Sequence, residues 1–186
     1  MQKKRVVPVL MAILVMAAAQ AMAGDFVLNS PQLEVGGIMS LEQVFDGFGC
    51  TGENVSPALN WSGEPAGTKS FAVTVYDPDA PTGSGWWHWL VFNIPATAHA
   101  LATDSGNPEK GLLPAGSVQS RTDYGKPGYG GACPPAGDKH HRYRFTVWAL
   151  DTPELPLDSD VSAAMVGFFL HRHQLGQATM TVIYGR

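Results

Sequence analysis

Two short segments, far apart in the chain, carry most of the side chains that could do chemistry. The first holds Asp77 and Asp79 in an Asp-Pro-Asp-Ala-Pro run and continues into Trp86-Trp87-His88-Trp89. The prolines restrict the backbone and remove hydrogen-bond donors, so this loop can hold the two carboxylates in fixed directions. A nearby carboxylate favours the charged form of histidine, so an aspartate close to His88 would favour its imidazolium form.

The second segment follows a glycine-rich stretch. It begins at Cys133-Pro134-Pro135 and ends at His140-His141-Arg142-Tyr143. Glycine lets the backbone approach a ligand closely, and exposed amides beside a histidine and a tyrosine hydroxyl suit a phosphate or a carboxylate. We therefore expect an anion-binding site in which His88 or His141 supplies a charged donor, Asp77 orients a histidine, and backbone amides near Gly137 contribute.

An enzyme is the alternative interpretation. Asp77 and His88 could serve as acid–base groups of a hydrolase, or His88 and His141 could hold a metal ion. The sequence contains no G-x-S-x-G elbow, no H-E-x-x-H motif and no evident activated nucleophile. An arginine and a tyrosine beside His141 also fit an anion better than a cation. The pattern favours a binding protein with no cofactor and no metal, although a histidine between two tryptophans can also be purely structural.

Strands must position both segments. Alternating or continuous apolar runs predict strands over 71–76, 87–94, 143–150 and 179–184, with a short one over 26–28. A helix is predicted over 161–174, capped by Ser159 or Asp160 and ended by Gly176, with an apolar face of Val161, Met165, Phe168, Phe169 and Leu175. The glycine-rich segment 104–138 is predicted to be an ordered, functional loop. This pattern predicts a mainly β fold, a two-layer antiparallel β-sandwich with peripheral helices.

The N-terminus is typical of a signal peptide. Lys3, Lys4 and Arg5 precede an apolar run, and Ala21-Met22-Ala23 supplies the small residues that a signal peptidase accepts. The apolar run is shorter than the roughly 20 residues that a spanning helix needs. We therefore predict cleavage after Ala23, export to the periplasm, and a single domain over 24–186 that is not embedded in a membrane.

Charge and cysteine content narrow the classes of partner. Without the three basic residues of the leader, nine basic residues face 16 acidic ones, a formal net charge of −7. No basic stripe remains, so the sequence argues against nucleic acid as a partner.

Cys50 and Cys133 are the two cysteines. Because an oxidising compartment favours disulfides, we expect these two to be joined.

Several motifs together resemble the phosphatidylethanolamine-binding protein family. They are Asp-Pro-Asp-Ala-Pro at 77–81, Trp-His-Trp at 87–89, Pro-Pro-x-Gly at 134–137 and His-Arg-Tyr-x-Phe at 141–145. Asn-Val-Ser-Pro-Ala-Leu-x-Trp at 54–61 and Thr-Gly-Ser-Gly-Trp-Trp-His-Trp at 82–89 resemble its bacterial, Raf-kinase-inhibitor-like branch of the YbhB/YbcL type, and the leader resembles the exported YbcL-like members. The resemblance extends over about 26–184.

The resemblance implies a fold and a site. It implies a large central antiparallel sheet on a smaller sheet, helices toward the C-terminus, and a small cavity for phosphate, acetate or a phospholipid headgroup. Matched residue by residue, the ligand site would comprise Asp77, Trp86, His88, Pro134, Pro135, His141 and Tyr143, with Trp86 at the mouth. Eukaryotic members bind and inhibit kinases or proteases, which implies a modulator of an unidentified protein partner, and bacterial relatives imply a homodimer. The C-terminal segment that gates the eukaryotic pocket has no match here, so no lid residues are assigned.

Overall fold

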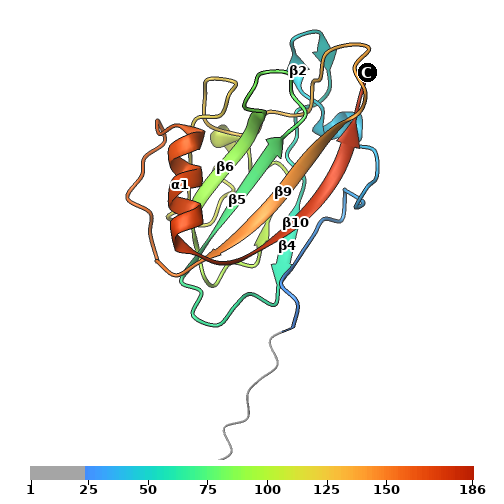
Figure 1. Ribbon diagram of the computed structural model, residues 1–186. Coiled ribbons are helices and arrows are strands. Elements are labelled where there is room, and N and C mark those ends of the chain that lie inside the picture. Colours follow the sequence, from blue (N-terminus) through green and yellow to red (C-terminus); the bar gives the residue numbers. More distant parts are fainter. Residues whose placement is uncertain (1–23) are drawn as a thin grey trace, which may run out of the picture.

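The computed structural model describes residues 24–186, which form mainly antiparallel strands (Figure 1). The predicted signal peptide, residues 1–23, lies outside the described residues. The large sheet has the order β10-β9-β5-β6-β8. Its strands are β5 (Ser70–Asp77), β6 (Trp86–Pro95), β8 (Val118–Gln119), β9 (His141–Leu150) and β10 (Gln174–Tyr184). The four long predicted strands are thus present, with β10 beginning five residues earlier than the apolar pattern indicates.

A smaller sheet packs on the large one. It has the order β1-β4-β7 and consists of β1 (Val27–Asn29), β4 (Leu59–Ser62) and β7 (Ala100–Leu101). A two-stranded hairpin of β2 (Asp46–Gly47) and β3 (Cys50–Thr51) stands near the C-terminus at the upper end in Figure 1. Two 3-10 turns, η1 (Leu41–Gln43) and η2 (Pro108–Lys110), complete the connections. The predicted antiparallel sandwich with a large and a small sheet is confirmed.

The central strands are buried on both faces, which explains their nearly continuous apolar sequence. In β9, Tyr143, Phe145 and Val147 point into the core between the two sheets. Trp148 and Leu150 belong to a second core on the side of α1 (Ala163–His173). The large sheet is therefore the middle layer. Successive residues of its strands point to opposite faces, so they contribute alternately to the two cores.

Helix α1 differs from its prediction in its ends and its buried face. Its N-cap is Ser162, whose hydroxyl accepts the Met165 amide at 3.3 Å. The buried residues are Ala163, Val166 and Leu170, whereas Phe168 is 61% exposed. The apolar residues of this helix extend over more than one face. The face with the smaller side chains packs on the sheet, and the phenylalanine is left exposed. Gly176 does not end the helix: it lies in β10, where an added Cβ would come within 2.9 Å of Pro65.

The long segment 104–138 is ordered by its own contacts. It contributes η2 and β8, and β8 pairs with β6. The predicted disulfide between Cys50 and Cys133 is present, with a Cα–Cα distance of 5.9 Å. It joins this segment to the β2–β3 hairpin. Within 24–186, no helix is both long enough and apolar enough to cross a membrane.

One end of the large sheet gathers the chemically capable side chains. The end of β5 lies beside the start of β6 and the start of β9, because both pairings of β5 are antiparallel. Asp77 is opposite Trp86 in the β5–β6 register. The two sequence segments of interest therefore meet at this end, next to the β2–β3 hairpin and the C-terminus.

Candidate ligand-binding site

A cavity of about 220 Å³ opens at this end of the sheet. All seven residues predicted for the ligand site line it: Asp77, Trp86, His88, Pro134, Pro135, His141 and Tyr143. Residues that the sequence did not single out as ligand contacts complete the wall: Phe48, Ala80, Pro81, Thr82, Tyr124 and Cys133. The fold thus brings the two predicted segments around one space. That these residues bind an anion remains a prediction.

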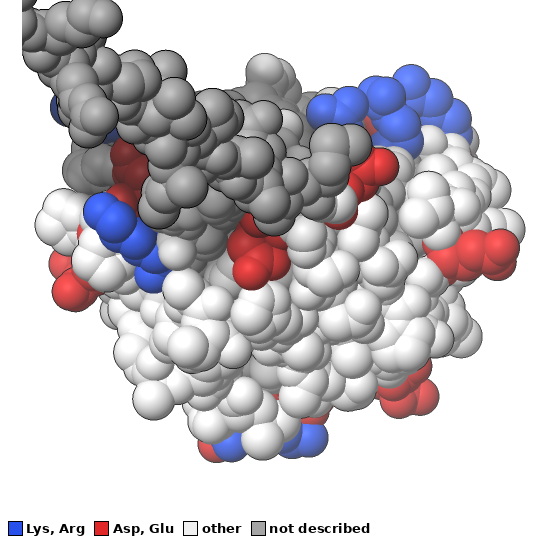
Figure 2. Space-filling view, turned by 90° about the horizontal axis from the view of Figure 1, so that it is seen from below, with Lys and Arg blue, Asp and Glu red and all other residues white. Residues whose placement is uncertain are grey.

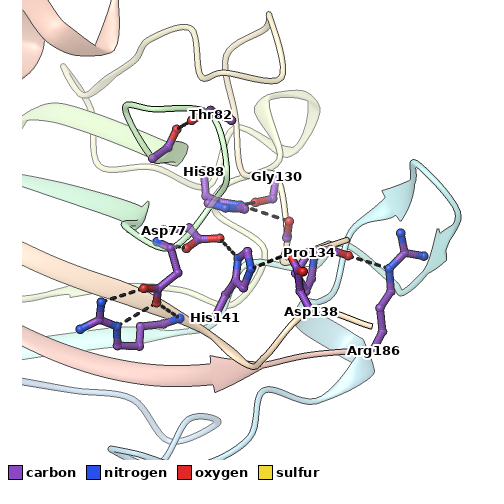
Figure 3. A network of polar contacts seen from close by, with 12 residues as sticks. Asp77, Thr82, His88, Gly130, Pro134, Asp138, His141 and Arg186 are labelled. Atoms are coloured by element: carbon purple, nitrogen blue, oxygen red, sulfur yellow. Dashed lines mark hydrogen bonds and ion pairs between the residues drawn. The ribbon is translucent and has the colours of Figure 1, made fainter. Parts of the chain in front are cut away.

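Asp77 and His141 form a buried pair at the floor of the cavity (Figure 3). His141 Nδ1 donates to Asp77 Oδ2 at 2.7 Å, and both side chains are almost fully buried. The other Asp77 oxygen accepts the backbone amide of Asp79 at 2.8 Å. His141 Nε2 lies 3.6 Å from a carboxylate oxygen of Asp138. A proton on either nitrogen of this ring therefore faces a carboxylate, and Asp77 orients His141 as the sequence suggests for one of the histidines.

A β-bulge turns His88 toward the cavity. Val75 pairs with Trp89 and Tyr76 with Trp87, so His88 has no opposite residue in β5. Bulges re-aim side chains and recur beside functional sites. The His88 ring contacts that of Tyr143 edge to face, with centroids 5.2 Å apart. Strict alternation would have placed His88 on the face opposite Trp89, and the bulge prevents that.

The tautomer of His88 follows from its hydrogen bonds. Nδ1 lies 2.7 Å from the Gly130 carbonyl oxygen and 3.2 Å from that of Gly131. Carbonyl oxygens only accept, so Nδ1 carries the proton. Burial lowers the pKa of His88 below its ordinary value, outweighing the opposing effect of the Gly130 carbonyl and of Asp77. The lowered pKa argues against His88 as the charged donor expected from the sequence.

Three buried polar atoms of the wall have no hydrogen-bond partner among the described residues. They are Trp86 Nε1, His88 Nε2 and Tyr143 Oη. An unpaired buried polar group costs roughly 1–3 kcal/mol, so such atoms need an explanation. Burial also raises the pKa of Tyr143 far above its ordinary value, which keeps its hydroxyl protonated. All three atoms belong to cavity-lining residues, and a polar ligand would satisfy them.

Arg142, between two cavity-lining residues of β9, does not face the cavity. Arg142 points out of the cavity and forms a two-pronged ion pair with Asp79, at 2.8 and 2.7 Å. This pair holds the pKa of Asp79 well below its ordinary value. Alternation along β9 explains the orientation: His141 and Tyr143 face inward, so Arg142 between them faces outward. The arginine beside His141, which in the sequence favoured an anion over a cation, therefore does not line the cavity.

The backbone amides of the glycine-rich segment are also engaged. The Gly137 amide donates to the Arg186 carbonyl at 2.9 Å, and the Gly131 amide donates to Asn54 Oδ1 at 2.7 Å. At Gly131 an added Cβ would come within 2.2 Å of the Gln43 carbonyl oxygen. Gly130 and Gly131 therefore allow close packing within the protein rather than approach of a ligand. The predicted ligand amide near Gly137 was wrong.

The β2–β3 hairpin borders the mouth of the cavity through Phe48, and the C-terminal Arg186 anchors this hairpin. Phe48, at the hairpin tip, is 70% exposed, and its ring stacks on that of Tyr124 with centroids 5.8 Å apart. Arg186 donates to the Pro134 carbonyl at 2.7 Å (Figure 3). It also donates to the carbonyls of Gly49 at 2.8 Å and Phe48 at 3.2 Å. The disulfide was the signal that could have placed Phe48 here, because Phe48 is two residues before Cys50.

No cluster of three or more histidine, cysteine or acidic side chains suited to a metal ion occurs in the described part of the chain. The cavity wall carries one carboxylate, two histidines, phenol and indole groups, and prolines, with neither lysine nor arginine. Fold and site together define a β-sandwich protein with a small, mostly apolar cavity and a few convergent polar groups, an arrangement typical of ligand-binding sites.

Comparison with known proteins assigns that class to a family. Residues 29–185 match the family model described as phosphatidylethanolamine-binding protein. The UPF0098 protein YbcL of Escherichia coli K12 is 54% identical over 88% of this chain and 90% of its own length. The UPF0098 protein YbhB of the same organism is 51% identical over 84% and 98%. The crystal structure of E. coli YbcL superposes with a TM-score of 0.86 at 53% identity, covering 88% of this chain and 99% of the other. The chain belongs to the phosphatidylethanolamine-binding protein family.

Proposed function

We propose that this chain is a binding protein whose cavity takes a small oxyanion, such as phosphate or a phosphorylated headgroup. The observation that carries the proposal is the convergence of three unpartnered polar atoms, on Trp86, His88 and Tyr143, in one cavity with a buried Asp77–His141 pair. Tyrosine and indole groups can donate to ligand oxygens, and His141 lies beside them on the wall. The proposal includes no catalytic step.

The experiment is a calorimetric titration with phosphoethanolamine. A hydrogen bond to a charged group is worth roughly 1.5–3 kcal/mol, so His88→Ala should weaken binding by about ten- to a hundredfold. Arg142→Ala is the matched control, because Arg142 is on the outer face, and its affinity should equal that of the wild type. Circular dichroism checks that each variant is folded. Equal affinity in wild type and folded His88→Ala would remove His88 from the site and favour its structural role.

Since His88→Ala also deletes the hydrogen bond to Gly130, a second variant guards against misfolding. Tyr143→Phe keeps the ring and removes only the unpartnered hydroxyl. It should bind phosphoethanolamine more weakly while remaining folded. If the wild type binds no phosphate compound and purifies with stoichiometric zinc, the metal-site alternative on His88 and His141 replaces this proposal.

The proposal extends to location and partners. We propose an exported, periplasmic protein whose leader is removed after Ala23, so that N-terminal sequencing of the mature chain begins at Gly24-Asp25-Phe26. The disulfide supports an oxidising compartment. We further propose that the chain forms a homodimer and modulates a protein partner through the cavity rim. The exposed ring of Phe48 at the mouth supports recognition of the rim.

The face visible in Figure 2 gives no sign of a nucleic-acid partner. On the visible face in Figure 2, acidic and basic side chains are scattered around a broad uncharged area, and no continuous basic stripe crosses the described atoms. Proteins that bind nucleic acids present such stripes or patches. We therefore propose small anions and proteins as the partners of this chain.

A further inference from the structure

Backbone carbonyls outside the cavity determine whether the His88 ring donates or accepts a hydrogen bond inside it. His88 Nδ1 carries a proton because two backbone carbonyls, of Gly130 and Gly131, face it. In a neutral ring the other nitrogen, Nε2, then has a lone pair and no proton. Nε2 is buried and without a partner among the described residues. In contrast to a charged histidine, this nitrogen can only accept a hydrogen bond.

The charges around His88 do not reverse this assignment. Asp77 on β5 and Asp123, in the segment after β8, favour the charged form, but burial has the largest effect and lowers the pKa. The other titratable groups on the cavity wall are Tyr124, His141 and Tyr143, and His141 is held against Asp77. Since the wall has neither lysine nor arginine, the site has little excess positive charge to offer a doubly charged anion.

Resting on the proposed function, we propose that the cavity selects oxyanions that still carry an acidic proton, specifically the singly charged form of phosphomonoesters. His88 Nε2 accepts the ligand O–H, while the Tyr143 hydroxyl and the Trp86 N–H donate to the other oxygens. His88 is then the residue that determines specificity. A phosphodiester of the same charge has no such proton, and the fully ionised monoester has lost it.

The need for an acidic proton on the ligand distinguishes a free headgroup from the same headgroup in an intact lipid. The phosphate of a glycerophospholipid that carries an ethanolamine headgroup is a diester, whereas free phosphoethanolamine is a monoester. The cavity therefore favours small soluble phosphomonoesters over the lipid from which a headgroup derives. It also predicts pH dependence, because the second pKa of a phosphomonoester is about 6.

The test compares methyl phosphate with dimethyl phosphate by calorimetry at pH 5.5 and pH 8. We expect methyl phosphate to bind at least tenfold more tightly than dimethyl phosphate at pH 5.5. At pH 8 only about 1% of methyl phosphate is singly charged, so its apparent affinity should fall by roughly fiftyfold or more. Dimethyl phosphate does not ionise in this range, and its titration reports any pH effect on the protein itself.

Two variants separate His88 from the rest of the wall. His88→Gln provides a side-chain amide that donates as well as accepts, so the preference for the monoester should drop below about threefold. Tyr143→Phe is the matched control: it should weaken both esters and keep their ratio.

Equal binding of the two esters by the wild type overturns this inference and leaves the proposed function standing. Tighter binding of methyl phosphate at pH 8 than at pH 5.5 also overturns this inference and leaves the proposed function standing. Failure of both esters and of inorganic phosphate to bind at either pH overturns the proposed function as well. If His88→Gln does not fold, the wild-type comparison and the ratio kept by Tyr143→Phe still decide the question.

Discussion

Loss of the Cys50–Cys133 disulfide should destabilise this protein strongly. The bridge closes a loop with a sequence separation of 83 residues. The chain-entropy relation for a loop of that length gives a loss of about 4.5 kcal/mol at 25 °C, near the top of the usual range for native disulfides. For a chain of this size, the melting temperature should fall by roughly 10–15 °C.

The assay is urea unfolding followed by tryptophan fluorescence, on the wild type and on a Cys50→Ala/Cys133→Ala double variant. Reduced wild type is the control, because it breaks the cross-link and keeps both side chains. If the free energy of unfolding falls strongly in the double variant but not in the reduced wild type, the destabilisation comes from loss of the buried Cys50 side chain and not from loss of the cross-link. A loss below about 1 kcal/mol in both would refute the loop argument. Because Cys133 lines the cavity beside Pro134, both samples should also bind phosphoethanolamine more weakly.

Two further predictions follow from the same structure. Because burial lowers the pKa of His88, the unfolded chain binds a proton at this residue that the folded chain does not. The free energy of unfolding, measured by urea titration, should therefore fall as pH drops below about 6.5. His88→Gln should flatten this pH dependence, whereas His140→Gln, at an exposed histidine, should leave it unchanged. In α1, Leu170→Ala should cost about 2–5 kcal/mol because Leu170 is fully buried, whereas the exposed Phe168→Ala should stay within about 0.5 kcal/mol of the wild type. Similar losses in the two α1 variants would contradict the observed orientation of the helix.

The sequence determined the strands, the class of fold and the identity of most site residues. Strands such as β5 are recognisable because both faces are buried and the sequence is apolar throughout. Asp77 and His141 stand at the junctions of strands with loops, where a site is expected. The pairing of the cysteines could be predicted because the sequence has only two and its N-terminus is typical of a signal peptide.

Tertiary structure alone decided which way several side chains face. The apolar residues of α1 fit more than one helical face, and packing on the sheet chose Val166 and Leu170. Arg142 lies beside His141 in the sequence, but its neighbours His141 and Tyr143 point inward and direct it outward. In the glycine-rich segment, backbone amides taken for ligand contacts are paired within the chain.

His88 shows the physical reason most clearly. Its presence between two tryptophans is visible in the sequence, but its direction depends on a bulge in the pairing of β5 with β6. Its protonation depends on two carbonyls that are more than forty residues away, at separations of 42 and 43. Local sequence specifies strand periodicity and residue type, whereas strand register, burial and distant hydrogen-bond partners arise only when the chain folds, and these set the chemistry of the cavity.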